Sequence, residues 1–270
     1  MSVNLLQRHH VQTLGQGSQP MLLAHGFGCD QQMWRFVAPA FASSHRVVTF
    51  DHIGCGRSDL RAYDPDRHVS LQGYADDVVA LMEAMALREV GLVGHSVSAM
   101  IGGLAAIRCP ERFARLVLVG PSPRYLNDPA TGYHGGFERA DIDGLIDMMD
   151  GNQMGWADFL APVVVGAGQP QAFTDELKAS FCAADPYINR RFAMATFLGD
   201  NRADLPQVRV PSLILQCADD AIAPPAVGQY LLDHLPNSRL QMLDVAGHCP
   251  HLTHPALTIA AIRGYLDTAV

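Results

Sequence analysis

The chain has 270 residues, of which 49 % are hydrophobic, and a formal net charge of −8. Its length allows one large α/β domain with a buried core, with or without an insertion, and its composition excludes wholesale disorder. It has a single lysine, no Lys/Arg cluster, no signal-peptide core and no apolar run of about 18 residues, so we expect a cytoplasmic protein that binds neither nucleic acid nor membrane.

Apolar runs in the first half of the chain alternate with helical patterns. Residues 3–13 predict an edge strand or hairpin, with residues 15–17 as its turn. Ser70 predicts the N-cap of a helix whose apolar residues recur at helical spacing over 74–85. Four further strands are expected at residues 21–24, 46–50, 90–93 and 115–119. Solidly apolar strands between helices indicate a mostly parallel sheet that is covered on both faces.

The pattern changes at Pro121, where proline breaks begin and no strand pattern follows for about 80 residues. Four short helical patterns occupy this segment. We expect Pro162 to shorten or kink the second, Thr174 to cap the third and Asp185 to cap the fourth. We therefore divide the chain into three parts. These are the first part of an α/β core (1–120), a four-helix cap (121–200) and the second part of the core (201–270).

Strand and helix patterns resume in the last part of the chain. Strands are expected at 211–217 and 239–245, with helices at 227–235 and around 259–266. The six cysteines are scattered without C-x-x-C spacing, which favours free buried thiols over disulfides or zinc ligands. We expect no cofactor and no metal, and metal binding by His251 and His254 is disfavoured.

The run from Leu92 to Gly103 passes from a strand to a helix through Ser96. This is the layout of a nucleophile elbow, in which a sharp turn presents the serine hydroxyl. The turn needs small residues two positions before and after the serine, and Gly94 and Ser98 meet this need, although Ser98 departs from strict G-x-S-x-G. Taken alone, the pattern fits equally well with Ser96 as an ordinary helix N-cap.

Candidate partners of Ser96 follow two later strands. Asp219 and Asp220 follow one strand, and His248 follows the next. The carboxyl ends of parallel strands share one edge of a sheet, so these loops can converge. The order Ser…Asp…His is that of the α/β-hydrolase triad, in which histidine takes the serine proton and the carboxylate holds the histidine tautomer. We favour Asp220 as the carboxylate, with Asp219 as the alternative.

Two glycine-punctuated loops follow early strands. The loop at residues 25–30, His-Gly-Phe-Gly-Cys-Asp, is interpreted as an oxyanion loop, with a plain strand-to-helix turn as the alternative. The backbone N–H groups of Phe27 and Val97 would then bind the developing oxyanion. The loop at residues 51–58 is interpreted as a structural turn, because no phosphate-binding motif follows it.

Aromatic residues of the predicted cap are candidates for the roof of a pocket, with packing between helices as the alternative. We expect an apolar pocket because the cap has no other apolar face to offer the core. Its predicted lining is Phe27, Phe137, Trp156, Phe159, Phe197 and Cys249. His25 and His95 flank the site and are expected to orient loops.

Several segments give the chain a specific family resemblance. They are residues 26–31, 59–64, 94–102, 120–128, 215–220 and 247–251. With these motifs the chain resembles the RsbQ-like α/β-hydrolases, bacterial sigma-factor activators related to the plant karrikin and strigolactone receptors. Ser98 is as in the plant receptors. The resemblance implies a Ser96–Asp220–His248 triad and a V-shaped four-helix cap over a deep apolar pocket.

Two functions compete at this point. One is a serine hydrolase that acts on a small hydrophobic ester or lactone through an acyl-enzyme. The other is a ligand-sensing signalling protein in which hydrolysis is slow or permissive, with a regulatory partner such as a sensor-domain phosphatase. We expect a monomer or a weak dimer. Dehalogenation is disfavoured because it needs an aspartate where this chain has Ser96, whereas carbon–carbon bond hydrolysis by the same triad stays open.

Overall fold

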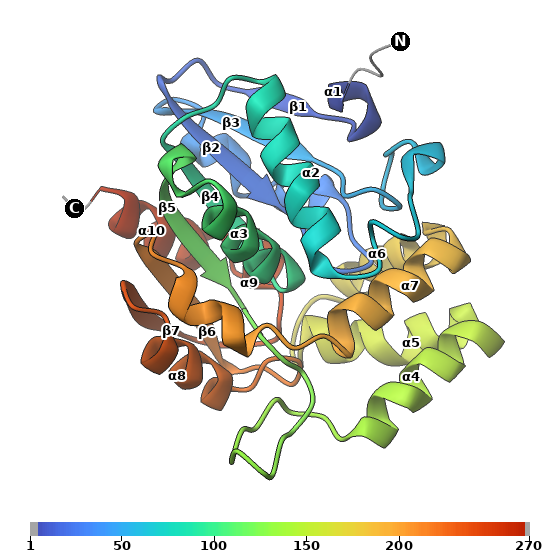
Figure 1. The fold of residues 1–270 in the computed structure, drawn as a ribbon. Coiled ribbons are helices and arrows are strands. Elements are labelled where there is room, and N and C mark those ends of the chain that lie inside the picture. The colour runs from blue at the N-terminus through green and yellow to red at the C-terminus, as the bar shows by residue number, and fades with distance from the viewer. Residues whose placement is uncertain (1–4, 268–270) are drawn as a thin grey trace.

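The computed structural model describes residues 5–267, in which a single sheet of seven strands is flanked by helices (Figure 1). The spatial order of the strands is β1-β3-β2-β4-β5-β6-β7. All neighbours are parallel except β1 and β3, which are antiparallel. The strands are β1 (Gln12–Leu14), β2 (Gln19–Ala24), β3 (His45–Phe50), β4 (Val90–His95), β5 (Phe113–Val119), β6 (Ser212–Asp219) and β7 (Ser238–Ala246). The predicted mostly parallel α/β sheet is confirmed.

The central strands are buried on both faces, which explains their unbroken apolar sequence. In β2, Met21 and Leu23 join one buried cluster, and Leu22 between them joins another on the opposite face. Successive side chains of a strand point to opposite faces, so each face receives every second residue. Two separate cores thus hold the sheet between layers of helices.

Helices from both ends of the chain cover the two faces. Buried residues of α2, α3 and α8 belong to one core, and those of α10 belong to the other. The described helices outside residues 121–200 are α1 (Leu5–Arg8), α2 (Leu71–Ala84), α3 (Val97–Arg108), α8 (Pro225–His234), α9 (Pro250–Thr253) and α10 (Pro255–Leu266). Short 3₁₀ turns are η1 (Gln31–Trp34), η2 (Ala38–Phe41), η3 (Leu60–Ala62), η4 (Pro110–Arg112) and η5 (Arg202–Gln207).

Four helices lie between β5 and β6 and gather at one end of the sheet (Figure 1). They are α4 (Arg139–Gly151), α5 (Gln153–Val165), α6 (Gln171–Ala183) and α7 (Pro186–Phe197). Helix α5 packs against α4 and α6, and α4 also packs against α7. In the described part of the chain, no helix is both long and apolar enough to span a membrane.

The structure corrects two local predictions. The predicted strand at residues 3–13 is replaced over Leu5–Arg8 by helix α1, because apolar residues there pack on the core as a helical turn; residues 3 and 4 lie outside the described part. The edge strand begins only at Gln12. Thr174 lies buried inside α6, which starts one turn earlier, after Pro170. Pro162 lies within α5, which ends three residues later at Val165; that it shortens or kinks the helix stays a prediction.

Candidate active site

Ser96 lies at the apex of the turn between β4 and α3. Its φ of 56° and ψ of −121° are rare for a residue with a side chain, and its N–H donates to the carbonyl of Val119 on the neighbouring strand at 2.8 Å. A Cβ at Gly94 would lie 2.4 Å from the Ser98 carbonyl oxygen, so the turn needs glycine there. The Ser96 hydroxyl does not cap α3. Ser96 therefore stands at the N-cap position of α3, but the missing capping hydrogen bond argues against its being an ordinary N-cap.

The structure brings Ser96, His248 and Asp220 into one hydrogen-bonded chain. The Ser96 Oγ lies 2.8 Å from His248 Nε2, and His248 Nδ1 lies 2.8 Å from Asp220 Oδ2. All three residues are buried. Because a carboxylate only accepts, His248 carries its proton on Nδ1, and Nε2 is free to accept the Ser96 proton. This is the hydrogen-bond order of an activated serine.

Asp220, rather than Asp219, faces the histidine. Its other carboxylate oxygen accepts the backbone N–H groups of Ile222 at 2.9 Å and Ala223 at 3.0 Å, which fixes the carboxylate in its loop. Asp219 is exposed at the end of β6, and its carbonyl accepts the N–H of Gly247. The two neighbouring aspartates therefore separate into one that contacts His248 and one that joins the two loops.

Tyr125 also contacts the Ser96 hydroxyl, with its Oη 3.2 Å from Ser96 Oγ. Since Ser96 donates to His248, the tyrosine must be the donor in this pair. Burial raises the pKa of Tyr125, so the phenol keeps its proton at neutral pH. Sequence reasoning missed this residue because it lies in an irregular segment after Pro121, where no periodicity marks a side chain as inward-facing.

The loop after β2 places Phe27 beside the elbow. Within the described residues, neither the Phe27 nor the Val97 N–H has a hydrogen-bond acceptor in the chain. Val97 is the first residue of α3, where the helix dipole also favours an anion. A Cβ at Gly26 would lie 2.5 Å from His95 Nδ1, so the loop approaches the elbow as closely as glycine permits. Both N–H groups are thus available to a ligand oxygen.

Buried histidines surround the site without entering the Ser96 chain. The Nε2–H of His95 donates to the His248 carbonyl at 2.9 Å, and the His25 ring bonds within the loop after β2. His251 packs between His95 and Trp34 with its ring tilted against both, and burial lowers its pKa to about 3. Burial also holds the pKa of His95 well below its ordinary value. These rings are therefore neutral.

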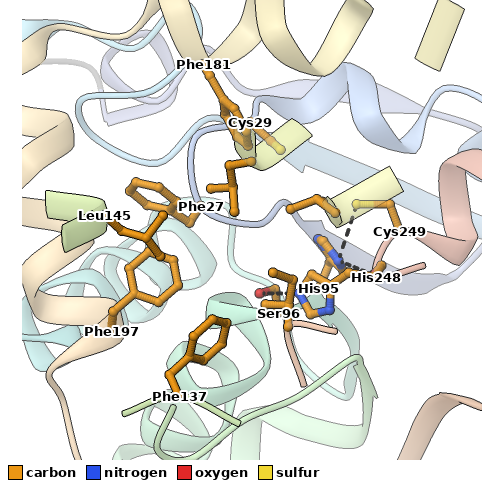
Figure 2. A pocket seen from close by; sticks show the side chains of 13 residues that line it. Phe27, Cys29, His95, Ser96, Phe137, Leu145, Phe181, Phe197, His248 and Cys249 are labelled. Carbon is orange, nitrogen blue, oxygen red and sulfur yellow. Dashed lines mark hydrogen bonds between the residues drawn. The ribbon is translucent and has the colours of Figure 1, made fainter. Parts of the chain in front are cut away.

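An apolar pocket of about 30 Å³ lies over Ser96 and His248 (Figure 2). A cavity of about 10–15 Å³ is needed to hold one water molecule, so this pocket has room for about two. In Figure 2, Phe27, Leu145 and Phe197 cluster on one side, and Phe181 and Cys29 close another. The full lining is Phe27, Cys29, His95, Ser96, Phe137, Leu145, Leu160, Val164, Phe181, Phe197, Ile222, His248 and Cys249.

Two predicted lining residues lie elsewhere. Phe159 is 55 % exposed on the outer side of α5, because only the stripe with Leu160 and Val164 turns inward. Trp156 is buried behind the lining, where its ring packs 4.8 Å from that of Phe181. The predicted residues Phe27, Phe137, Phe197 and Cys249 do line the pocket.

Sequence reasoning missed six apolar lining residues. They are Cys29, Leu145, Leu160, Val164, Phe181 and Ile222. Four of them lie on α4, α5 and α6, where helical spacing marks an apolar face without showing whether it meets the pocket or another helix. The sequence could have predicted Cys29 as a lining residue, because it lies two residues after Phe27 in the same loop.

The fold and this site define an α/β hydrolase. Residues 21–261 match the model of the alpha/beta hydrolase family, so the chain belongs to that family. It is 38 % identical to strigolactone esterase D14 of Arabidopsis thaliana, over 96 % of this chain and 97 % of that one. It is also 38 % identical to karrikin insensitive 2 receptor CA of Petunia hybrida, over 96 % of each chain. The resemblance to the plant receptors is thereby confirmed.

A solved structure agrees closely with this fold. A hydrolase from Oleispira antarctica superposes with a TM-score of 0.96 and 41 % sequence identity, over 98 % of this chain and 97 % of that one. The agreement covers the sheet, its helices and the four helices between β5 and β6.

Proposed function

We propose that the chain is a serine hydrolase that cleaves a small, uncharged, hydrophobic ester or lactone through an acyl-enzyme. One observation carries the proposal: the Ser96–His248–Asp220 hydrogen-bond chain lies on the floor of an apolar pocket. The name of one similar plant protein, strigolactone esterase D14, supports the same class. The unbonded N–H groups of Phe27 and Val97 give the site its oxyanion donors.

The reaction follows from the position of each proton. Ser96 Oγ attacks the substrate carbonyl carbon, and His248 Nε2 takes the hydroxyl proton while Asp220 stabilises the resulting imidazolium. The carbonyl oxygen becomes negative and accepts from the Phe27 and Val97 N–H groups. His248 then returns its proton to the leaving alkoxide, which departs as an alcohol, or stays attached if the substrate is a lactone. Water activated by the same histidine releases the acid and restores Ser96.

The pocket favours a neutral, apolar substrate. Its lining is almost entirely aromatic and aliphatic, and its polar members, Ser96, His95 and His248, are hydrogen-bonded to one another. A buried charged substrate would lose its hydration with no opposite charge to compensate. The pocket has room for only about two water molecules. An ester therefore enters only if lining side chains move, and we propose that residues 121–200 act as the cap that admits it.

A second candidate function is ligand sensing with a protein partner. It is favoured by the similarity to a named karrikin receptor over almost the whole chain. On this proposal slow hydrolysis accompanies a contact with a regulatory protein, such as the sensor-domain phosphatase implied by the resemblance to RsbQ-like proteins. Pull-down from host extract with and without a lactone tests it. A partner retained only with lactone supports sensing, and fast turnover with no partner supports a purely metabolic enzyme.

Hydrolysis of p-nitrophenyl acetate tests the first proposal. We expect Ser96→Ala to lose at least about 10³-fold in kcat, because the nucleophile is removed while the fold stays intact. A serine-directed phosphonate should label the wild type on the peptide that contains Ser96. Ser70→Ala is the matched control, since Ser70 is exposed and its side chain makes no capping bond. Full activity in Ser96→Ala would contradict the mechanism.

A further inference from the structure

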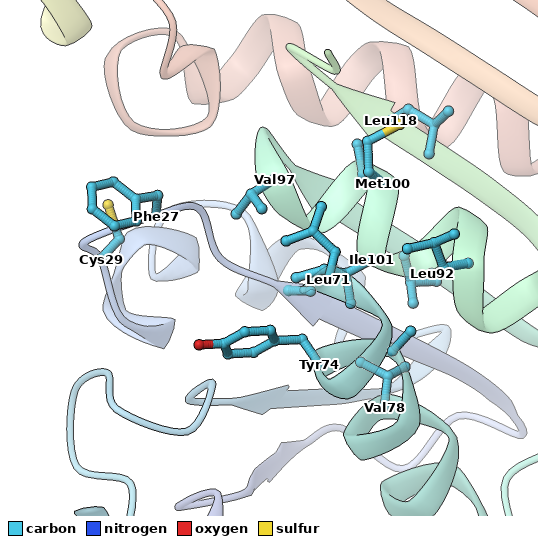
Figure 3. Packing of buried hydrophobic residues seen from close by; sticks show 14 of the residues in the cluster. Phe27, Cys29, Leu71, Tyr74, Val78, Leu92, Val97, Met100, Ile101 and Leu118 are labelled. Carbon is cyan, nitrogen blue, oxygen red and sulfur yellow. The ribbon is translucent and has the colours of Figure 1, made fainter. Parts of the chain in front are cut away.

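Ser98 occupies the elbow position where G-x-S-x-G has glycine, and its side chain is fully buried. Its helix, α3, is held firmly, because Val97 and Ile101 pack in the same apolar cluster as Leu71 and Tyr74 of α2 (Figure 3). The Ser98 hydroxyl does not enter this cluster. It contacts the His25 carbonyl oxygen at 2.5 Å and the His52 Nε2 at 2.7 Å.

The protons of these contacts can be placed in one consistent way. A carbonyl only accepts, so the Ser98 O–H donates to His25 O, and Ser98 Oγ accepts from the Nε2–H of His52. The His25 Nδ1–H donates to the Gly26 carbonyl at 2.8 Å, which leaves His25 Nε2 to accept the His52 backbone N–H at 3.0 Å. Burial lowers the pKa of both histidines, which keeps them neutral.

This network fixes the peptide that carries one oxyanion donor. The Gly26 carbonyl and the Phe27 N–H belong to the same planar peptide unit, so a bond that holds the carbonyl also sets the direction of the N–H. His25 holds that carbonyl with its ring, and Ser98 holds the carbonyl of His25 itself. A side chain of α3 is thus hydrogen-bonded directly to the loop that carries the Phe27 N–H.

We propose that Ser98 is a positioning residue that aims the Phe27 N–H at the oxyanion, a role that rests on the hydrolase function proposed above. Only the transition state has the full oxyanion, so a misdirected donor lowers kcat and leaves substrate binding nearly unchanged. Complete loss of one such donor costs about 10²–10³-fold in kcat. We expect partial loss, of about 10–100-fold, when the Ser98 hydroxyl is removed.

Steady-state hydrolysis of p-nitrophenyl acetate by Ser98→Ala tests the proposal. We expect kcat to fall by this factor while KM stays within about threefold of the wild-type value. The variant should lose affinity to a matching degree for a trifluoromethyl ketone, because the adduct of that ketone with Ser96 carries an oxyanion. Ala105→Gly is the matched control, because it weakens buried α3 without touching His25 or His52. It should lower thermal stability and leave kcat unchanged.

The outcomes separate this proposal from the hydrolase proposal. An inactive wild type would overturn the hydrolase function itself. An active wild type with unchanged kcat in Ser98→Ala, or with KM raised alone, would overturn the positioning role. A fall in kcat that Ala105→Gly reproduces would assign the effect to general loosening and would also overturn it. If Ser98→Ala does not fold, Ser98→Gly removes the same hydroxyl with the residue that G-x-S-x-G has at this position, and the same outcomes apply.

Discussion

Replacing Asp220 by asparagine tests the tautomer on which the proposed chemistry depends. One carboxylate oxygen accepts two backbone N–H groups, from Ile222 and Ala223, and the other accepts the Nδ1–H of His248 at 2.8 Å. An asparagine at this position must keep its side-chain carbonyl oxygen toward the N–H groups of Ile222 and Ala223. If its NH₂ group faced them instead, hydrogen-bond donors would face donors and both hydrogen bonds would be lost. The amide NH₂ therefore points at His248.

The consequence for His248 follows from donor and acceptor roles. Facing an N–H donor, Nδ1 must accept, so the ring proton moves to Nε2, which lies 2.8 Å from Ser96 Oγ. The Ser96 proton then has no base to receive it. The wrong tautomer, with geometry otherwise intact, costs about 10⁴-fold in kcat, equivalent to about 5.5 kcal/mol. We expect a loss of this size in Asp220→Asn, with KM little changed.

The assay is steady-state p-nitrophenyl acetate hydrolysis, with thermal unfolding to show that the variant is folded. Asp219→Asn is the matched control, because that side chain is exposed and the hydrogen bond from Gly247 goes to the backbone carbonyl of Asp219, which the substitution keeps. It should retain kcat within about twofold. If Asp220→Asn keeps kcat within tenfold of the wild type, the tautomer argument is refuted. If instead Asp219→Asn causes the large loss, the carboxylate has been wrongly assigned.

Two further predictions concern the pocket and the buried histidines. Phe181→Ala should destabilise the fold by roughly 3 kcal/mol, because the ring is buried. The space it frees should raise kcat/KM for p-nitrophenyl butyrate relative to acetate, and an unchanged ratio would remove Phe181 from the acyl pocket. The lowered pKa values of His52, His95 and His251 keep these rings neutral in the fold, while the unfolded chain takes up protons below about pH 6.5. The free energy of unfolding should therefore be fully maintained above about pH 6.5 and fall as the pH drops below it, by up to about 1.4 kcal/mol per pH unit for each ring. Urea unfolding between about pH 7.5 and 5 measures this slope, and a flat profile would contradict it.

The sheet could be predicted from the sequence because its strands satisfy a strong local rule. Strands such as β4 and β5 are buried on both faces and therefore read as unbroken apolar runs. The secondary structure of the first residues could not be predicted, because Leu5 and Leu6 pack on the core from a single helical turn. Such a turn is too short for a helical period of apolar residues to show in the sequence. Local sequence patterns identify elements that are long or buried on both sides. They fail where a few tertiary contacts determine whether a short segment forms a helix or a strand.

The Ser96, Asp220 and His248 positions could be predicted because loops after parallel strands share one edge of the sheet. The pocket could not be predicted to the same degree. Helical spacing groups Trp156 and Phe159 with the inward residues of α5. The neighbours Phe159 and Leu160 nevertheless differ, since Leu160 lines the pocket and Phe159 is exposed, so the outcome depends on a rotation of the helix about its axis by a single residue. That rotation depends on how α5 packs against α4 and α6, which the sequence of α5 alone does not contain.

Helix α5 contacts the loop that follows β7 and carries His248. The His248 N–H donates to the carbonyl of Val164 near the end of α5 at 2.8 Å. A Cβ on Gly247 would lie 2.2 Å from the Val165 carbonyl oxygen, and one on Gly166 would lie 2.7 Å from the Cα of Gly247. The end of α5 therefore contacts the loop that carries His248, while Val164 also lines the pocket. On the proposed mechanism, a substrate that displaces the pocket-lining residues of α5 would act on the same residues that hold His248, and substrate binding would alter the position of the proposed base.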